Sequence, residues 1–161
     1  IIRNQNGHFI HAMAIPLGEG INNYAETEAA RIGVQWCLDN GFPRIQLEAD
    51  SALLVRWLTE KNEPPWALTE KISQLRLLCS LFEDFKITHV YREANCPADS
   101  LSKLSHELTL PAHFTNVASL PSYIRGQIIQ DQWSTPAFRH KTTKKIKVPL
   151  HMASTSSHGY G

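Results

Sequence analysis

The stretch Arg44-Ile45-Gln46-Leu47-Glu48-Ala49-Asp50-Ser51 decides the fold, because a short strand runs directly into the start of a helix. Its apolar residues alternate with polar ones, which places them on one face of a strand. Asp50 and Ser51 then open a helix over residues 53–58. A carboxylate in this place lies at the carboxyl end of a strand, where open α/β sheets bind their ligands. Asp50 is therefore the first candidate site residue.

Two further acidic residues stand in short motifs of their own. Glu26 ends Asn22-Asn23-Tyr24-Ala25-Glu26, and Asp99 ends Arg92-Glu93-Ala94-Asn95-Cys96-Pro97-Ala98-Asp99. Glu26 and Asp99 are each predicted in the first turn of a helix, where a single acidic residue commonly caps the helix or offsets its dipole. Asp50, at the start of its own helix, can have the same structural roles. As a set, the three carboxylates are the hard oxygen ligands that Mg²⁺ prefers, and they suggest two-metal phosphodiester chemistry.

The segments around these motifs predict an α/β fold. Asn6-Gly7 is a turn signal inside a hairpin over residues 1–14. Asn22 or Asn23 can cap a helix that runs to about Asn40 and stops at Gly41. The spacing of apolar residues assigns the stripe of this helix that faces the core to Ala25, Ala29, Ile32 and Trp36.

The remaining elements complete a mixed sheet with helices packed on it. A helix over residues 68–82, a strand over 86–91 and a last helix from Pro97 give the order β-β-α-β-α-α-β-α. Three tryptophans at helical or helix-adjacent positions are predicted to be core residues rather than platforms for nucleic-acid bases: Trp36, Trp57 and Trp66.

Composition divides the chain into two parts. Residues 1–108 hold ten basic and fourteen acidic residues, a formal charge of −4, and residues 109–161 hold six basic residues and Asp131, a formal +5. We expect a domain over residues 1–108 and a proline-containing basic tail over 109–161 that is mostly disordered, with one short docked helix within 120–129. The lysines of residues 140–147 fit a nuclear signal, a phosphate-binding arm or, more simply, a solvated tail.

Three cysteines, odd in number and far apart, argue against a disulfide framework and favour an intracellular, reducing compartment, without deciding between nucleus and cytoplasm. The sequence contains no long apolar run, so we expect no membrane partner. Nothing in it indicates an oligomer, and a monomer is the default expectation.

In order and spacing, the three motifs resemble those of the ribonuclease H (RNase H) family. The matching elements are the Asn-Asn-x-x-Glu turn, the Glu-Ala-Asp-Ser strand end and the Arg-Glu-Ala-Asn-x-x-Ala-Asp-Ser-Leu-Ser loop and helix, within about residues 1–106. The chain looks particularly like the RNase H-like domains of plant proteins and plant non-LTR retrotransposons. The resemblance implies hydrolysis of the RNA strand of an RNA·DNA hybrid with two Mg²⁺ or Mn²⁺ ions. By position it makes catalytic metal ligands of Glu26, Asp50 and Asp99, and nucleic-acid contacts of Asn22, Asn23 and Asn95.

The sequence departs from the family pattern in three places. The family's first aspartate lies on a leading central strand, and this sequence starts after it, so we expect an N-terminally truncated form of a longer protein, weak or inactive by itself. Without that strand, the hairpin is left with an unpaired edge. The loop of residues 92–98 has no histidine, and a short segment without basic excess, residues 59–63, replaces the basic handle of some members.

Two main hypotheses follow from these observations. The first is a metal-dependent RNase H-type endonuclease that selects its strand by A-form shape and 2′-hydroxyl groups. The second is a catalytically inactive RNase H-like module that binds nucleic acid or a protein, which the departures favour. A polynucleotidyl transferase or integrase relative is a third possibility, against which the early Asn-Asn-x-x-Glu motif argues.

Overall fold

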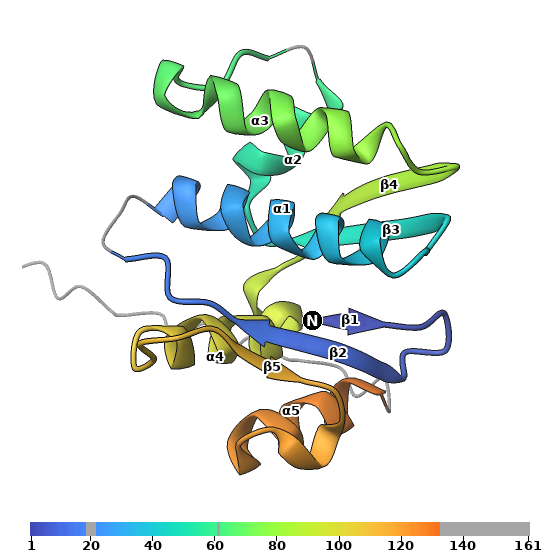
Figure 1. Cartoon of the computed structure of the whole chain (residues 1–161), viewed down its shortest axis with the longest axis vertical. Coiled ribbons are helices and arrows are strands. Elements are labelled where there is room, and N and C mark those ends of the chain that lie inside the picture. Colours follow the sequence, from blue (N-terminus) through green and yellow to red (C-terminus); the bar gives the residue numbers. More distant parts are fainter. Residues whose placement is uncertain (19–21, 61, 133–161) are drawn as a thin grey trace, which may run out of the picture.

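A computed structural model describes residues 1–18, 22–60 and 62–132, which form strands and helices in two layered halves (Figure 1). None of the helices in these ranges is long and apolar enough to cross a membrane. The elements, in chain order, are β1 Ile2–Arg3, β2 Phe9–Ala14, α1 Asn22–Asp39, β3 Arg44–Ala49, α2 Ala52–Thr59, α3 Trp66–Cys79, β4 Asp84–His89, the 3₁₀ helix η1 Arg92–Asn95, α4 Cys96–Ser105, β5 Ala112–Phe114, the 3₁₀ helix η2 Val117–Ser119 and α5 Ser122–Gln132.

The strands form two sheets rather than one continuous mixed sheet. In the first, β2 lies between β1 and β5 and is antiparallel to both. In the second, β3 and β4 run parallel over six residue pairs, from Arg44 opposite Asp84 to Ala49 opposite His89. In the described part of the chain, β1 pairs only with β2 and β3 pairs only with β4, so β1 and β3 each present an open edge. Unpaired edges of this kind can accept a further strand.

The predicted hairpin is present, and glycine determines its turn. Gly7 has φ +76°, a backbone conformation that residues with a Cβ adopt only at a cost, and its amide donates to the Asn4 carbonyl oxygen at 2.9 Å. The Asn4 amide donates in turn to the His8 carbonyl oxygen, also at 2.9 Å. Residues 4–8 therefore connect the strands, a longer connection than a two-residue turn at Asn6-Gly7.

Helix α1 begins and ends where the sequence predicts, but its buried face is different. It stops before Gly41, which takes φ +73° as a helix-terminating glycine does. Its buried residues are Thr27, Glu28, Ala30, Val34 and Cys37. The predicted core face of Ala25, Ala29, Ile32 and Trp36 is only partly right: Ala29 is exposed and Ala25 and Ile32 are half-buried, whereas the half-buried Trp36 does pack against the core.

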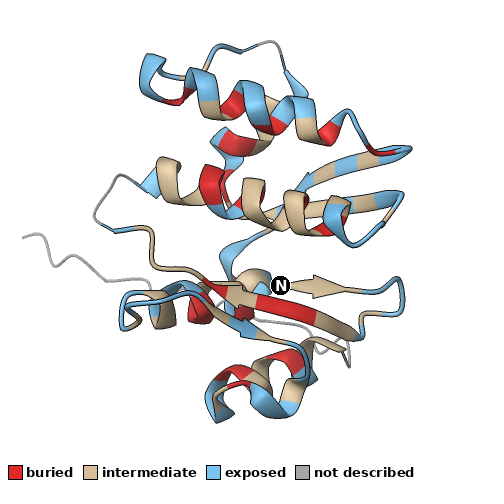
Figure 2. Cartoon of the chain, viewed as in Figure 1, coloured by how far each residue is buried: buried red, intermediate tan, exposed pale blue. Residues whose placement is uncertain are grey.

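The upper half of the molecule has its own hydrophobic core, between the three helices α1, α2 and α3 and the β3–β4 sheet. Figure 2 shows buried positions along all three helices. The fully enclosed side chains include Val34 of α1, Leu54 of α2, and Leu68, Ile72 and Leu75 of α3. Apolar β3 residues pack against this core from the other side, as their alternation predicts: Ile45, Leu47 and Ala49.

A second core fills the lower half and extends beyond Leu108. Ile124 and Ile128 of α5 are completely buried beside Ala12 and Ala14 of β2 and Leu101 of α4. The predicted docked helix is thus confirmed, as α5. Residues 112–132 belong to the packed structure, which corrects the disorder expected there. Strand β5 forms hydrogen bonds with an edge of β2, and α5 covers apolar side chains of the lower core. The lysine cluster lies outside the described residues, and the domain boundary at Leu108 stays a prediction.

The tryptophans take three different environments. Trp57 is buried, as predicted. Trp36 is half-buried, and its indole stacks on the His11 imidazole with ring centroids 4.6 Å apart. Trp66 is 91% exposed, so its assignment to the core is wrong. It opens α3 directly after Pro64-Pro65, and the inward face of that helix starts with Leu68.

Candidate active site

Asp50 lies where β3 ends, with one residue, Ser51, between it and the start of α2. Ser51, not Asp50, is the N-cap: its Oγ accepts from the Leu54 amide at 3.3 Å. The Asp50 carboxylate is therefore not used in capping, and its side chain is one-quarter exposed. This removes capping as an explanation for this acid and leaves its favourable position near the positive end of the α2 dipole.

Asp99 lies in the first turn of α4, where its charge favourably meets the positive end of the helix dipole. Pro97, in the same turn, suits a helix start because the missing amide would have no partner there. The two carboxylate oxygens of Asp99 have different partners. Oδ2 lies 2.7 Å from Lys103 Nζ, one turn along the helix, and Oδ1 lies 3.5 Å from Arg92 Nη2.

Arg92 brings Asp50 and Asp99 to one place. Its Nε lies 3.9 Å from Asp50 Oδ2, while its Nη2 faces Asp99. Three separate elements thus converge, since Asp50 follows β3, Arg92 begins η1 and Asp99 belongs to α4. Arg92 stands in the quoted loop motif, and the sequence analysis missed its bridging position. The available signal was weak: a basic residue a few positions before a candidate acid.

Glu26 faces the same groove from α1. It is half-buried and lies just beyond the first turn, since α1 begins at Asn22, which corrects its predicted first-turn position. Glu26, Asp50 and Asp99 all line one open groove of about 1640 Å³, together with Arg92 and Asn95. Residues 2–3 of β1 and 44–49 of β3 line it along their whole lengths, so the groove separates the two sheets.

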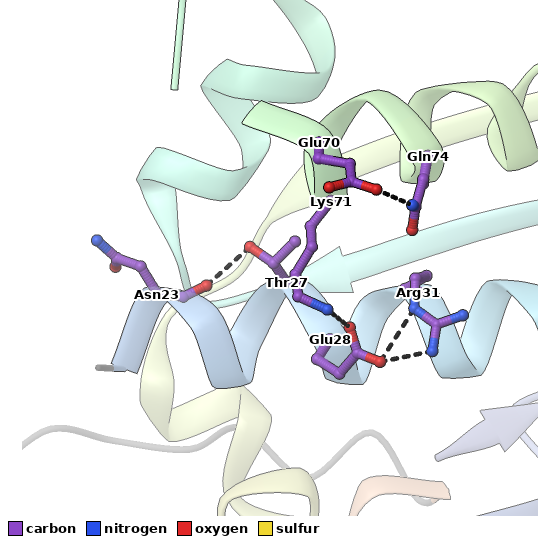
Figure 3. A network of polar contacts seen from close by, with 7 residues as sticks. All are labelled: Asn23, Thr27, Glu28, Arg31, Glu70, Lys71 and Gln74. Carbon is purple, nitrogen blue, oxygen red and sulfur yellow. Dashed lines mark hydrogen bonds and ion pairs between the residues drawn. The ribbon is translucent and has the colours of Figure 1, made fainter. Parts of the chain in front are cut away.

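A partly buried ion-pair network anchors α1 on the side opposite to Glu26. Glu28 accepts from Arg31 Nε at 3.0 Å and from Lys71 Nζ of α3 at 3.0 Å (Figure 3). The hydrogen bond from Arg31, more than that from Lys71, lowers the pKa of Glu28 against the opposing effect of burial. Positions 26 and 28 are about 200° apart around a helix. Anchoring Glu28 to α3 therefore directs Glu26 to the other side.

The oxygen donors of this groove fit a hard divalent cation in kind. The space between Asp50 and Asp99 also already accommodates a positive group, the Arg92 guanidinium. However, within residues 1–18, 22–60 and 62–132, no group of three or more His, Cys, Asp or Glu side chains is close enough to hold a metal ion. The structure thus brings Asp50 and Asp99 together and places Glu26 in the same groove, without a closed three-carboxylate centre.

The three asparagines assigned to nucleic-acid binding lie at helix starts. Asn22 is exposed at the beginning of α1, and Asn23 is half-buried beside it. The Asn23 carbonyl oxygen accepts from the Thr27 hydroxyl at 2.7 Å, which ties the first turn together (Figure 3). Asn95 is half-buried and lines the groove. Their contact with nucleic acid stays a prediction.

The chain is similar to a known protein family and to two curated proteins. Residues 1–105 match the family described as reverse transcriptase-like. Ribonuclease HI of Halobacterium salinarum is 37% identical over 89 residues, which cover 53% of this chain and 44% of that protein. A putative ribonuclease H protein of Arabidopsis thaliana is 29% identical over 117 residues, which cover 70% of this chain and 18% of that protein.

A solved structure is also similar. The crystal structure of RNase H1 from Halobacterium salinarum superposes with a TM-score of 0.54 and 34% identity, covering 56% of this chain and 70% of that chain. The chain spans less than half the length of the two curated relatives that it matches. The matched family covers well over half of the chain and includes all three acidic motifs. The chain therefore belongs to the reverse transcriptase-like family and carries an RNase H-like domain.

Proposed function

We propose that this chain is the larger part of a nuclease domain that hydrolyses the RNA strand of RNA·DNA hybrids. The observation that carries the proposal is the convergence of Asp50 and Asp99 on one guanidinium, in a groove that Glu26 also lines. The family relationship supplies the substrate class, because the similar proteins are named as ribonucleases H.

In this proposal Glu26, Asp50 and Asp99 hold divalent metal ions, Mg²⁺ or Mn²⁺. When bound, such ions activate water and stabilise the leaving oxygen of a phosphodiester. The chain's own contribution is to fix the acids on three elements around the groove. A further carboxylate, from a strand that fills the groove between β1 and β3, would complete the centre. Asn22, Asn23 and Asn95 would contact the hybrid, and A-form shape would select the RNA strand.

The test is a cleavage assay on an RNA·DNA hybrid with Mg²⁺ or Mn²⁺, run on this chain and on a form extended upstream along its coding sequence. We expect the extended form to be the more active. In that form Asp50→Asn should reduce the cleavage rate by at least 100-fold, because loss of a carboxylate that holds the metal ions removes several kcal/mol of transition-state stabilisation. Asp39→Asn is the matched control, since Asp39 is exposed at the end of α1 and does not line the groove. Full activity of Asp50→Asn would refute the proposal.

The second candidate is an RNase H-like module that binds nucleic acid or a protein without catalysis. Two observations favour it: no three-carboxylate centre is formed in the described residues, and both Arg92 and Lys103 neutralise Asp99. Binding of the hybrid by the extended form, measured by fluorescence anisotropy, with no cleavage under any metal condition would establish this alternative over the first.

A further inference from the structure

Arg92 makes a loose bridge between two acids from different elements. The distances of 3.9 Å to Asp50 and 3.5 Å to Asp99 are longer than those of a close charge-assisted hydrogen bond, which is about 2.8 Å. The arginine side chain is 77% exposed, whereas the two carboxylates are only about one-quarter exposed. The two acids are thus the more enclosed partners, and the cation between them is the solvent-exposed one.

The bridge has an electrostatic reason. Two carboxylates that face one groove repel each other, and a positive group between them offsets the repulsion. Arg92 supplies that charge from within the chain. It does so at Asp50 Oδ2 and Asp99 Oδ1. A divalent ion held by both acids would compete with the guanidinium for these two carboxylates.

We propose that Arg92 is an exchangeable counter-ion of the metal site, which occupies Asp50 and Asp99 in the metal-free protein and leaves when a divalent ion binds. This inference rests on the proposed function, in which these two acids hold metal ions. Arg92 is a positioning residue under this proposal: it keeps the two carboxylates directed at a common point before the ion arrives.

Lys103 cannot take this role, although it is closer to Asp99. Its Nζ contacts Asp99 Oδ2, on the same helix face, and in the described residues it forms no ion pair with Asp50. The contact leaves Oδ1 to Arg92. Lys103 therefore fixes the orientation of the Asp99 carboxylate, while Arg92 occupies its other oxygen.

Release of Arg92 costs little free energy. Ion pairs with a largely exposed partner are weak, because water solvates the separated groups almost as well. A planar guanidinium can also fork between two carboxylates, which a compact ammonium group cannot do as well. A weak, forked bridge both keeps the acids in place and yields to an ion of double charge.

The test is a titration of the full chain and its variants with Mn²⁺, followed by the loss of the free-ion signal in electron paramagnetic resonance. Removing one positive charge close to the ion should tighten binding, so Arg92→Gln is expected to bind Mn²⁺ about three- to tenfold more tightly than wild type. Arg92→Lys keeps the charge without the fork and should lie between the two. Arg56→Gln, an exposed arginine of α2 that does not line the groove, should match wild type.

The outcomes separate this inference from the proposed function. If wild type binds Mn²⁺ through Asp50, as shown by loss of binding in Asp50→Asn, and Arg92→Gln binds no more tightly, Arg92 is not a competing counter-ion. Arg92→Lys binding equal to that of wild type would likewise refute the bridge, because charge alone would then suffice. If no variant shows Mn²⁺ binding that depends on Asp50, the metal site itself is refuted, and with it the proposed function.

Discussion

Glu28 of α1 and Lys71 of α3 are joined by a contact of 3.0 Å between Oε2 and Nζ, 43 residues apart in the sequence. The same Lys71 ammonium lies 4.7 Å from the centre of the Tyr24 ring, one turn before Glu28. One cation thus contacts α1 at two successive turns. Because α1 also carries Glu26, this link between helices bears on the geometry of the groove as well as on stability.

Replacing Glu28 should destabilise the fold. Glu28 is only 8% exposed, and Glu28→Gln leaves the Arg31 and Lys71 cations without their carboxylate. Both cations are partly exposed and can turn to water, so we expect a loss of about 2 kcal/mol in the free energy of unfolding, below the range for fully buried pairs. Urea denaturation measures this. Glu70→Gln, exposed on α3, should change stability by less than about 0.5 kcal/mol.

The same carboxylate should contribute to acid sensitivity. The pKa of Glu28 is lowered from its ordinary value of 4.5, first by the Arg31 hydrogen bond. The unfolded chain therefore binds the proton more readily, and the stabilisation is full above pH 4.5 and lost as the pH falls through the lowered pKa. We expect unfolding free energies measured from pH 6 to pH 3 to fall less steeply in Glu28→Gln than in wild type. Parallel curves would contradict the assignment.

His11 should produce a second pH dependence, at higher pH. Burial, and then the neighbouring His113, lower the pKa of His11 from 6.5. The folded protein thus favours the neutral imidazole, so the stability is complete above pH 6.5 and declines as the pH falls through the lowered pKa. His11→Phe keeps a ring against Trp36 and removes the titration. Melting temperatures from pH 7.5 to pH 5 should decline less in this variant, whereas the exposed His89→Gln should follow wild type.

The segment after Leu108 should be essential to stability. Ile124 of α5 is completely buried in the lower core, whereas Ile129 on the same helix is 37% exposed. Ile124→Ala should lower the free energy of unfolding by about 3 kcal/mol through lost burial and the cavity left behind. Ile129→Ala should lower it by less than about 1 kcal/mol. Equal effects in denaturant melts would mean that α5 does not pack as described.

The sequence predicts those features of the fold that local signals determine. Gly41 ends α1 because a left-handed residue is needed there, and the alternation of residues 45–49 sets the inward face of β3. The candidate site residues could also be identified locally, because each of the three acids stands in a short sequence motif. The position of Asp50 before a separate cap, Ser51, required the structure, because both aspartate and serine are residues that commonly cap a helix.

Other features depend on distant parts of the chain. Helix α1 carries small or apolar residues on both sides, so its periodicity could not show that Thr27 and Val34 are buried while Ala25 and Ile32 are only half-buried. The bridging role of Arg92 needed the relative placement of β3 and α4. Strand β5 has only three residues, too few for a recognisable alternation of apolar and polar residues. Its partner β2 lies about 100 residues earlier, so local sequence could not predict the pairing either.

The absence of ladder hydrogen bonds between β1 and β3, within the ranges that the structure describes, has a dynamic consequence. Each half keeps a core of its own, and side-chain packing, the Arg92 ion pairs and the chain crossings couple them. Partial unfolding should therefore begin between β1 and β3, and we expect the backbone amides there to exchange with solvent fastest. A ligand that contacts both halves would slow amide hydrogen exchange in both of them.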